Sequence, residues 1–318
     1  GHPILPPATR MPFNRRHLLQ ALALPLLPAL APAAHAQAWP TRPVKLIVGY
    51  SPGGAVDVIA RSLAQPLAAA LGQAVIVDNK PGAGTNIAMR ALIDSAPDGH
   101  TLMLVANAAA ANPSLYQPPP FDTQRDLTPV SLVGRVPVVI AAGAGAGLES
   151  VAQLIAQSKA KPGSLNFGTP GNGSTPHLAV ELFERAAGIE LTHVPYKGGS
   201  QAITDVLAGH VQLVAVNALE VQPHVKAGKL RVLTVLSPQR TPIFPDAPSI
   251  GESGYPGFEA AVWYGVVGPA GLPPAAVTRL HAELQKALAL PEVRDRLAGA
   301  GGEVLPGPVE RFTMLLAS

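Results

Sequence analysis

The 318-residue sequence contains no cysteine, which excludes a disulfide framework, thiolate metal sites and a lipidated cysteine after a leader. Charged residues are also scarce, at 14%, whereas hydrophobic residues make up 47%. This balance is typical of a chain that buries a large core and excludes a disordered one. A single core rarely serves a chain of this length, so we expect two lobes.

Acidic residues are missing from residues 1–36, which hold Arg10, Arg15 and Arg16. These three arginines account for the formal net charge of +3, because the whole chain has 23 basic and 20 acidic residues. The remaining chain is electrically balanced, and it has no basic run interleaved with aromatic residues. Such a surface does not attract a polyanion, so nucleic acid is not an expected partner.

The same segment has the pattern of an export signal. A charged start at residues 14–17 precedes an apolar stretch at 18–30, and Ala34-His35-Ala36 forms an A-x-A cleavage site. The apolar stretch is shorter than the roughly 20 residues that span a bilayer. We therefore expect a mature periplasmic protein from about Gln37, soluble after cleavage near Ala36. The paired arginines leave the general and twin-arginine export routes open.

Beyond this segment, short β-branched runs alternate with stretches of helical periodicity, which predicts an α/β fold with parallel strands. Strands are expected at 44–48, 74–77, 102–105, 138–140, 165–168, 191–194, 211–216, 231–236 and 263–267. Helices are expected from residue 55 to Gly72, at 85–95, 150–159, 175–187, 201–208 and 222–227, and after Pro273-Pro274 and Pro291. Residues 107–129 are expected to form an extended surface connection, with regular structure resuming at Val130.

The pattern repeats, so we expect lobe 1 to comprise residues 37–135 and 240–318, and lobe 2 residues 136–239. Two crossover strands, near 134–137 and 237–242, should join them.

Two glycine-rich turns, each between a strand and a helix, are candidate anion sites: Ser51-Pro52-Gly53-Gly54 and residues 171–176. Helix starts leave backbone N–H groups unpaired and carry partial positive charge, and glycine allows a ligand to approach them closely. Ser174 or Thr175 would equally serve as an ordinary helix cap. A cleft with one such turn on each side would hold a carboxylate without a metal.

Other candidate groups have more than one interpretation. Asp57 lies in the first turn of a helix, where it would compensate the dipole, hold the loop or accept a hydrogen bond from a ligand. His177 and Glu181 lie four residues apart, which is compatible with two ligands of a metal. Ser174 lies close to His177 in the sequence, which is compatible with the nucleophile of a hydrolase. An ordinary polar helix face explains these residues better. The phosphate-loop, dinucleotide, G-x-S-x-G and H-E-x-x-H motifs are absent, so neither a metal nor a cofactor is expected.

Short motifs in one order resemble those of the Bug-type receptors, the periplasmic subunits of tripartite tricarboxylate transporters. The resemblance runs from about residue 39 to 312 and is carried by these segments: Trp39-Pro40-Thr41-Arg42-Pro43, Pro52-Gly53-Gly54 with Asp57 and Arg61, Asn79-Lys80-Pro81-Gly82-Ala83-Gly84, Pro97-Asp98-Gly99, Asn112-Pro113-Ser114-Leu115-Tyr116, His193-Val194-Pro195-Tyr196-Lys197-Gly198, Lys226-Ala227-Gly228-Lys229-Leu230 and Pro269-Ala270-Gly271.

The resemblance implies a type II periplasmic-binding-protein fold, with two α/β lobes and a ligand cleft that holds a small carboxylate. The implied ligand contacts are Ser51, Pro52, Gly53, Gly54, Asp57, Ala106, Asn107, Ala108, Ser174, Thr175, His177 and, with less support, Tyr196. The chain departs from the family pattern where the strand at 211–216 ends on Asn217 instead of an acid. The alanine-rich run from Ala106 to Ala111 suggests a more apolar or larger acid, and an end at Ser318 suggests a shortened last helix.

We therefore expect a receptor that closes two lobes over a small carboxylate and delivers it to the subunits of a membrane transporter, without catalysis. A monomer is the simplest expectation. The alternatives are a secreted hydrolase that uses Ser174 and His177, and a binding protein that serves a sensor. The residues leave open a dicarboxylate, an aromatic acid or an amino acid.

Overall fold

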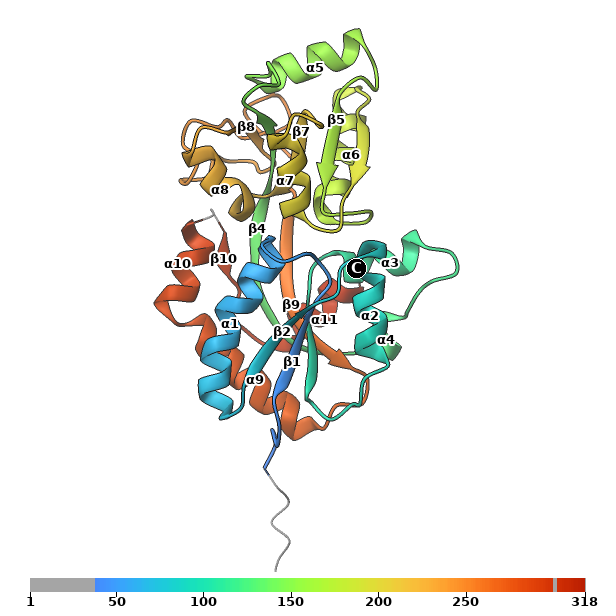
Figure 1. Cartoon of the computed structure of the whole chain (residues 1–318), viewed down its shortest axis with the longest axis vertical. Helices are drawn as coiled ribbons and strands as arrows, with labels where there is room; N and C mark the ends of the chain where they lie inside the picture. The colour runs from blue at the N-terminus through green and yellow to red at the C-terminus, as the bar shows by residue number, and fades with distance from the viewer. Residues whose placement is uncertain (1–37, 300–301, 318) are drawn as a thin grey trace, which may run out of the picture. The chain divides into compact units, whose positions relative to one another are not determined.

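The computed structural model describes residues 38–299 and 302–317. The predicted export signal and its cleavage site lie outside the described residues. The segment Trp39–Ser318 forms one compact unit (Figure 1). None of the helices described there is both long enough and apolar enough to cross a membrane.

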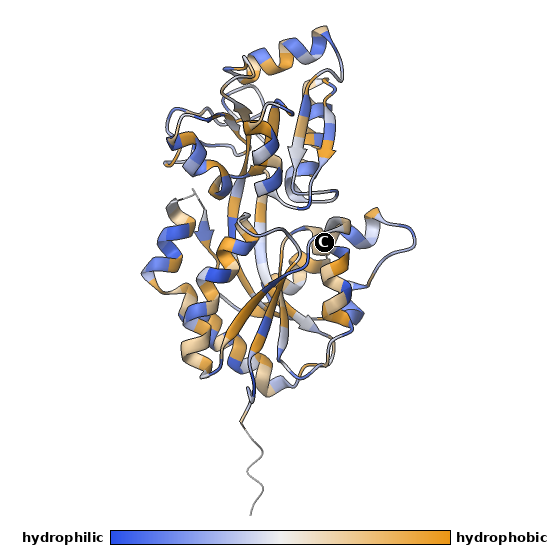
Figure 2. Ribbon diagram, in the orientation of Figure 1, coloured by the Kyte–Doolittle hydropathy of each residue, from blue (hydrophilic) through white to orange (hydrophobic). Residues whose placement is uncertain are grey.

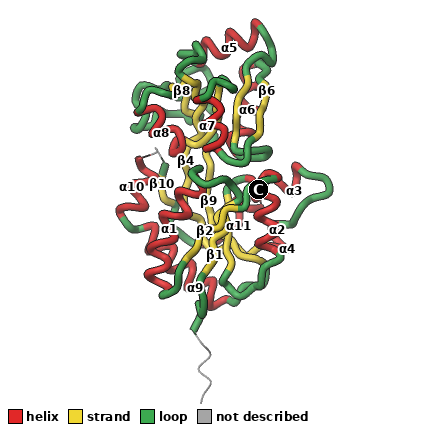
Figure 3. Tube along the Cα trace, viewed as in Figure 1, coloured by secondary structure: helices red, strands yellow, loops and turns green. Residues whose placement is uncertain are grey.

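The first of two sheets in this unit, sheet A, has the strand order β2-β1-β3-β9-β4, with β10 paired to β4. The two pairs that involve β1 are parallel, whereas β9 is antiparallel to both β3 and β4. Its strands are β1 (Val44–Val48), β2 (Val75–Asn79), β3 (Thr101–Val105), β4 (Leu127–Gly143), β9 (Ala261–Pro269) and β10 (Glu303–Val304). Figure 3 shows these strands surrounded by helices.

Side chains alternate between the two faces of sheet A, because successive residues of a strand point in opposite directions. Leu46 of β1 and Leu104 of β3 belong to one hydrophobic cluster with helices α1 and α9. Ile47 and Met103 belong to a second cluster with α2 and α11. Helices therefore cover both faces, which is why these strands read as continuous apolar runs (Figure 2).

The helices of this part of the chain are α1 (Ala55–Leu71), α2 (Asn86–Ile93), α3 (Ala108–Leu115), α4 (Thr123–Asp126), α9 (Pro274–Leu288), α10 (Pro291–Gly299) and α11 (Val309–Ala317), together with the short 3-10 turn η2 (Ala83–Thr85). The expected extended connection at 107–129 is wrong in part, because α3 and α4 lie there and β4 begins at Leu127. The alanines at 108–111 have high helix propensity, which outweighs the neighbouring prolines.

The second sheet, sheet B, has the order β8-β4-β7-β5-β6 and shares β4 with sheet A. Strand β5 is parallel to both its neighbours. The strands are β5 (Asn166–Thr169), β6 (Thr192–Pro195), β7 (Leu213–Asn217) and β8 (Leu230–Val235), and the helices are α5 (Val151–Ala160), α6 (Thr175–Ala187), α7 (Gly199–Leu207) and α8 (Ala218–Lys226). The predicted α/β fold with two sheet-containing lobes is confirmed.

Strand β4 joins the two sheets, because it pairs with β9 up to Pro137 and with β7 and β8 from Val138 onward. The first crossover was predicted near 134–137, and β4 changes its pairing partner between Pro137 and Val138. The second lies later than 237–242, since Pro248 and Ile250 still hydrogen-bond to Val235 of β8. The proline-rich course of residues 238–248 favours loops over a strand. The chain reaches sheet A at Ala261, so we propose the second lobe boundary near residue 260.

Candidate ligand-binding site

The loop after β1 is held by Asp57, a buried residue in the first turn of α1. Its carboxylate accepts hydrogen bonds from the Gly53 N–H at 3.0 Å, the Arg61 Nε at 3.0 Å and the Asn79 Nδ2 at 3.0 Å. Burial alone would raise the pKa of Asp57, but the hydrogen bonds from Arg61, Gly53 and Asn79 outweigh it, and the pKa is lowered. The ionised carboxylate of Asp57 therefore holds the loop in place.

The second predicted turn leads into α6, and it is also tightly ordered. Ser174 is the N-cap residue: its Oγ donates to the carbonyl of Gly171 at 2.8 Å and accepts from the backbone N–H of His177 at 3.5 Å. Gly173 has φ +78°, and a Cβ there would lie 2.8 Å from Oδ1 of Asn112. Only glycine allows this turn to pass so close to α3.

The start of α7, Gly198 and Gly199, contacts the loop after β1. The Ser51 N–H donates to the carbonyl of Lys197 at 3.3 Å, and Oγ of Ser200 donates to the carbonyl of Pro52 at 3.1 Å. A Cβ at Gly198 would overlap Oγ of Ser51, and one at Gly199 would overlap Oε2 of Glu220. Glycine at position 198 permits the start of α7 to approach the loop after β1, and glycine at position 199 permits the approach of Glu220 from α8.

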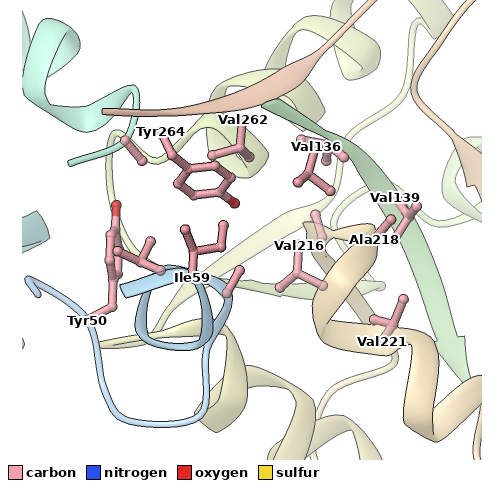
Figure 4. Packing of buried hydrophobic residues seen from close by; sticks show 14 of the residues in the cluster. Tyr50, Ile59, Val136, Val139, Val216, Ala218, Val221, Val262 and Tyr264 are labelled. Carbon is pink, nitrogen blue, oxygen red and sulfur yellow. The ribbon is translucent and has the colours of Figure 1, made fainter. Parts of the chain in front are cut away.

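A small cavity lies among these helix starts: it leaves about 20 Å³ for the centres of water-sized molecules, within about 360 Å³ of unfilled space that includes open solvent. The starts of α1, α6 and α7 contribute to its wall, together with β9 and the start of α8. Its lining residues are Tyr50, Gly54, Ala55, Val56, Ala106, Pro170, Ser174, Thr175, Pro176, Gly199, Asn217, Glu220, Val262 and Tyr264. Figure 4 shows part of the adjoining core, with Tyr50, Val262 and Tyr264 among the labelled side chains.

Four buried polar atoms at this cavity or in the adjoining loop have no hydrogen-bond partner: Oγ of Ser51, Oγ1 of Thr175, Oδ1 of Asn217 and Oε2 of Glu220. Buried polar groups in folded proteins are nearly always paired, by protein groups, water or a ligand. A concentration of unpaired atoms at one cavity therefore indicates a place where a polar ligand completes the hydrogen bonding.

Glu220 is the carboxylic acid among the residues that line the cavity. Burial raises its pKa to about 7, although the Ala55 N–H and the Asn217 side chain act in the opposite direction. No lysine, arginine or histidine occurs among the cavity-lining residues given above. Burial, followed by the nearby Glu220 carboxylate, also raises the pKa of Tyr50 and Tyr264. The cavity thus stabilises neutral forms of its own acidic groups.

Of the predicted contacts, Gly54, Ala106, Ser174 and Thr175 line the cavity. Ser51, Pro52 and Gly53 lie in the adjoining loop, and Asp57 holds that loop through the Gly53 N–H.

The remaining four predicted residues are Asn107, Ala108, His177 and Tyr196, which do not line the cavity. The Asn107 Oδ1 accepts from the Trp263 N–H at 2.9 Å, and the Tyr196 hydroxyl donates to Asp205 at 2.6 Å.

The geometry of Ser174 and His177 does not form a nucleophile–base pair. Nδ1 of His177 accepts from the Gly173 N–H at 3.1 Å, Nε2 faces Glu181 at 3.5 Å, and the ring stacks on His193 with centroids 3.9 Å apart. Burial lowers the pKa of both histidines, that of His193 to about 4. In the part of the chain that the structure describes, no group of three or more His, Cys, Asp or Glu side chains is placed to hold a metal.

Tyr50, Glu220 and Tyr264 were not predicted as site residues. Glu220 looks like an ordinary first-turn acid of a helix, and Tyr264 lies within an apolar strand. One signal was available: the strand before α8 ends on Asn217, and Glu220 follows three residues later. The Nδ2 atom of Asn217 donates to both Oε1 of Glu220 and the Tyr264 hydroxyl, each at 2.9 Å.

The fold is that of the two-lobe periplasmic solute-binding proteins. A structure of the periplasmic binding protein BugD has 32% sequence identity, a TM-score of 0.83 and coverage of 87% of this chain and 95% of its own. The structure of R. palustris Rpa4515 with adipate has 34% identity, a TM-score of 0.84 and coverage of 87% and 93%.

Residues 59–316 match the family described as tripartite tricarboxylate transporter family receptor. Protein BugT of Bordetella pertussis is 38% identical over 292 residues, which cover 91% of this chain and 90% of BugT. The chain belongs to the tripartite tricarboxylate transporter receptor family. The resemblance inferred from the sequence motifs is thereby confirmed.

Proposed function

We propose that this protein is a periplasmic receptor that binds a small carboxylate between its two lobes and delivers it to a tripartite tricarboxylate-type membrane transporter. The observation that carries the proposal is the meeting of three helix starts at one cavity with unpaired polar atoms. Backbone N–H groups at helix starts stabilise a carboxylate without a metal. The adipate held by a relative of similar fold supports the same ligand class.

In this proposal the ligand's carboxylate lies against the start of α6, near Thr175. Binding favours the arrangement in which Ser51 contacts the start of α7, and a membrane partner then recognises that arrangement. The protein acts as a monomer, and no bond of the ligand is made or broken. A receptor that serves a sensor would use the same site.

A thermal-shift screen of the protein from Gln37 onward tests this proposal, after bound ligand has been removed by unfolding and refolding. The panel contains mono-, di- and tricarboxylates, aromatic acids and amino acids. A ligand that binds only the folded state raises the melting temperature, by an amount that depends on its concentration. We expect at least one carboxylate to do so and to be recovered unchanged, and chemical conversion of the ligand would indicate the hydrolase instead.

No rise with any acid would contradict the receptor proposal. Substitution of Thr175 by valine supplies a site-directed check, because it removes the unpaired hydroxyl and keeps the volume of the side chain. We expect weaker binding, by about 5- to 10-fold. Thr313→Val, on α11 away from the cavity, is the matched control and should leave the affinity unchanged.

A further inference from the structure

The wall of the cavity formed by the start of α8 presents two acceptor atoms without partners, Oδ1 of Asn217 and Oε2 of Glu220. Asn217 is only 3% exposed. The Nδ2 atom of Asn217 donates to Glu220 and to the Tyr264 hydroxyl, so both of its hydrogens are used. Turning the amide over would set Oδ1 against the Glu220 carboxylate, two acceptors face to face. Oδ1 is therefore the atom left free.

These two atoms need hydrogen-bond donors, and an ionised Glu220 also needs a positive charge nearby. The residues that line the cavity supply no such charge, because none of them is Lys, Arg or His. The neighbouring Arg61 is already used by Asp57 and Asn79. A carboxylate that is buried without a counter-charge is costly, so a ligand that provides one gains affinity.

An ammonium group meets both requirements, since it carries three N–H donors and a full positive charge. The start of α6 has the contrary character, because the unpaired hydroxyl of Thr175 and the backbone N–H groups there suit a carboxylate. A second carboxylate at the Glu220 end would instead face an acid and an acceptor. The cavity therefore suits a ligand with no net charge.

We propose that Asn217 and Glu220 form a subsite for the ammonium group of the ligand, so that this receptor takes a zwitterionic amino-carboxylic acid in preference to a dicarboxylate. The inference rests on the proposed receptor function and specifies its ligand class. It assigns to Glu220 a role in specificity, through direct contact with the ligand.

Titration calorimetry at pH 8 with ligand-free protein tests the subsite with pairs of acids that differ only by an amine. The pairs are propionate and L-alanine, butyrate and 4-aminobutyrate, succinate and L-aspartate, and adipate and L-2-aminoadipate. In at least one pair we expect the amino member to bind about 10- to 100-fold more tightly, as for a hydrogen-bonded charge pair. This comparison uses the wild-type protein alone, so it stands whether or not a variant folds.

Glu220→Gln keeps the shape of the side chain and removes its charge. We expect this variant to bind the amino member of the preferred pair about 10- to 100-fold more weakly and the amine-free member within about 2-fold of wild type. Glu292→Gln, an exposed position on α10, is the matched control and should change neither value.

Two results would overturn the subsite and leave the receptor function intact. One is tighter binding of the amine-free member in every pair that binds. The other is adipate binding that weakens as the pH rises past 7, which would mean that a protonated Glu220 donates to a ligand carboxylate. If no member of any pair binds, and no other acid of the screen does, the receptor function itself fails.

Discussion

Two carboxylates lie close to the first turn of α1, and their surroundings give them opposite properties. Asp57 accepts hydrogen bonds from Gly53, Arg61 and Asn79, and its pKa is lowered despite burial. Glu220 accepts from Asn217, keeps one oxygen unpaired, and burial raises its pKa to about 7. Burial is common to both groups, so the difference comes from the donors and the cation supplied by the fold.

This comparison separates a structural acid from one that is available to a ligand. The hydrogen bonds of Asp57 are complete within the protein, and they fix the loop that precedes α1. Those of Glu220 are incomplete, at the wall of a cavity without a cation. Each of the following changes tests one side of the comparison.

Asp57→Ala should have the largest effect, because it leaves the Gly53 N–H without its acceptor and removes one of the two acceptors of the Asn79 amide group. We expect the free energy of unfolding in urea at pH 7.5 to fall by about 2 to 4 kcal/mol. Asp57→Asn keeps one acceptor oxygen and should lose less. If Asp57→Ala costs no more than Glu220→Gln at the same pH, the structural role assigned to Asp57 is wrong.

Glu220→Gln should change how stability depends on pH. The folded protein holds the Glu220 proton up to about pH 7, whereas the unfolded chain releases it near 4.5, so wild type loses stability as the pH rises through this window. The glutamine variant lacks this loss, and we expect it to gain on the order of 2 kcal/mol relative to wild type between pH 4.5 and 8.

Urea unfolding of both proteins at intervals across this range measures the difference. The groups that face Glu220 do not interfere: Tyr50 and Tyr264 titrate far above the window, and Asn217 and the Ala55 N–H are neutral. His177 and His193 have lowered pKa values and act in the opposite direction, but equally in both proteins. A pH-independent difference would contradict the raised pKa of Glu220.

The fold was largely predictable from the sequence, since hydrophobic periodicity is a local property. The predicted strand at 44–48 and the predicted helix at 175–187 have the bounds of β1 and α6. The second crossover was placed too early, and α3 was not predicted, because prolines and alanines gave conflicting local signals there. Hydrogen bonds to β8 keep residues 248–250 beside sheet B, and the helix propensity of the alanines forms α3.

The site was predictable only in part, for a related reason. Glycine-rich turns before helices are visible in the sequence, and they led to Gly54, Ser174 and Thr175. The role of Glu220 depends on the approach of α8 to the start of α1, and nothing in the local sequence encodes that distance. The same holds for Asp57, whose partner Asn79 lies 22 residues away. A carboxylate's neighbours, more than its position in a helix, decide what it does.

Gly198→Ala should have the smallest effect. It tests whether ligand binding depends on the contact between the start of α7 and the loop that Asp57 holds. A Cβ at Gly198 would overlap Oγ of Ser51 and lie 3.0 Å from the Ser51 backbone nitrogen. The backbone at Gly198 is extended, so alanine introduces no strain of its own. The methyl group therefore opposes the contact between the two segments and leaves each segment intact.

We expect Gly198→Ala to weaken the binding of the ligand found in the thermal-shift screen by about 10-fold, while the free energy of unfolding without ligand changes by less than about 1 kcal/mol. Gly145→Ala is the matched control, since a Cβ there meets no atom within 4 Å. Equal affinities for the two variants would mean that the Ser51–Gly198 contact plays no part in binding. If the double variant Gly198→Ala with Ser51→Gly regains part of the lost affinity, the effect lies at this contact. The second change removes the side chain that the new methyl group overlaps.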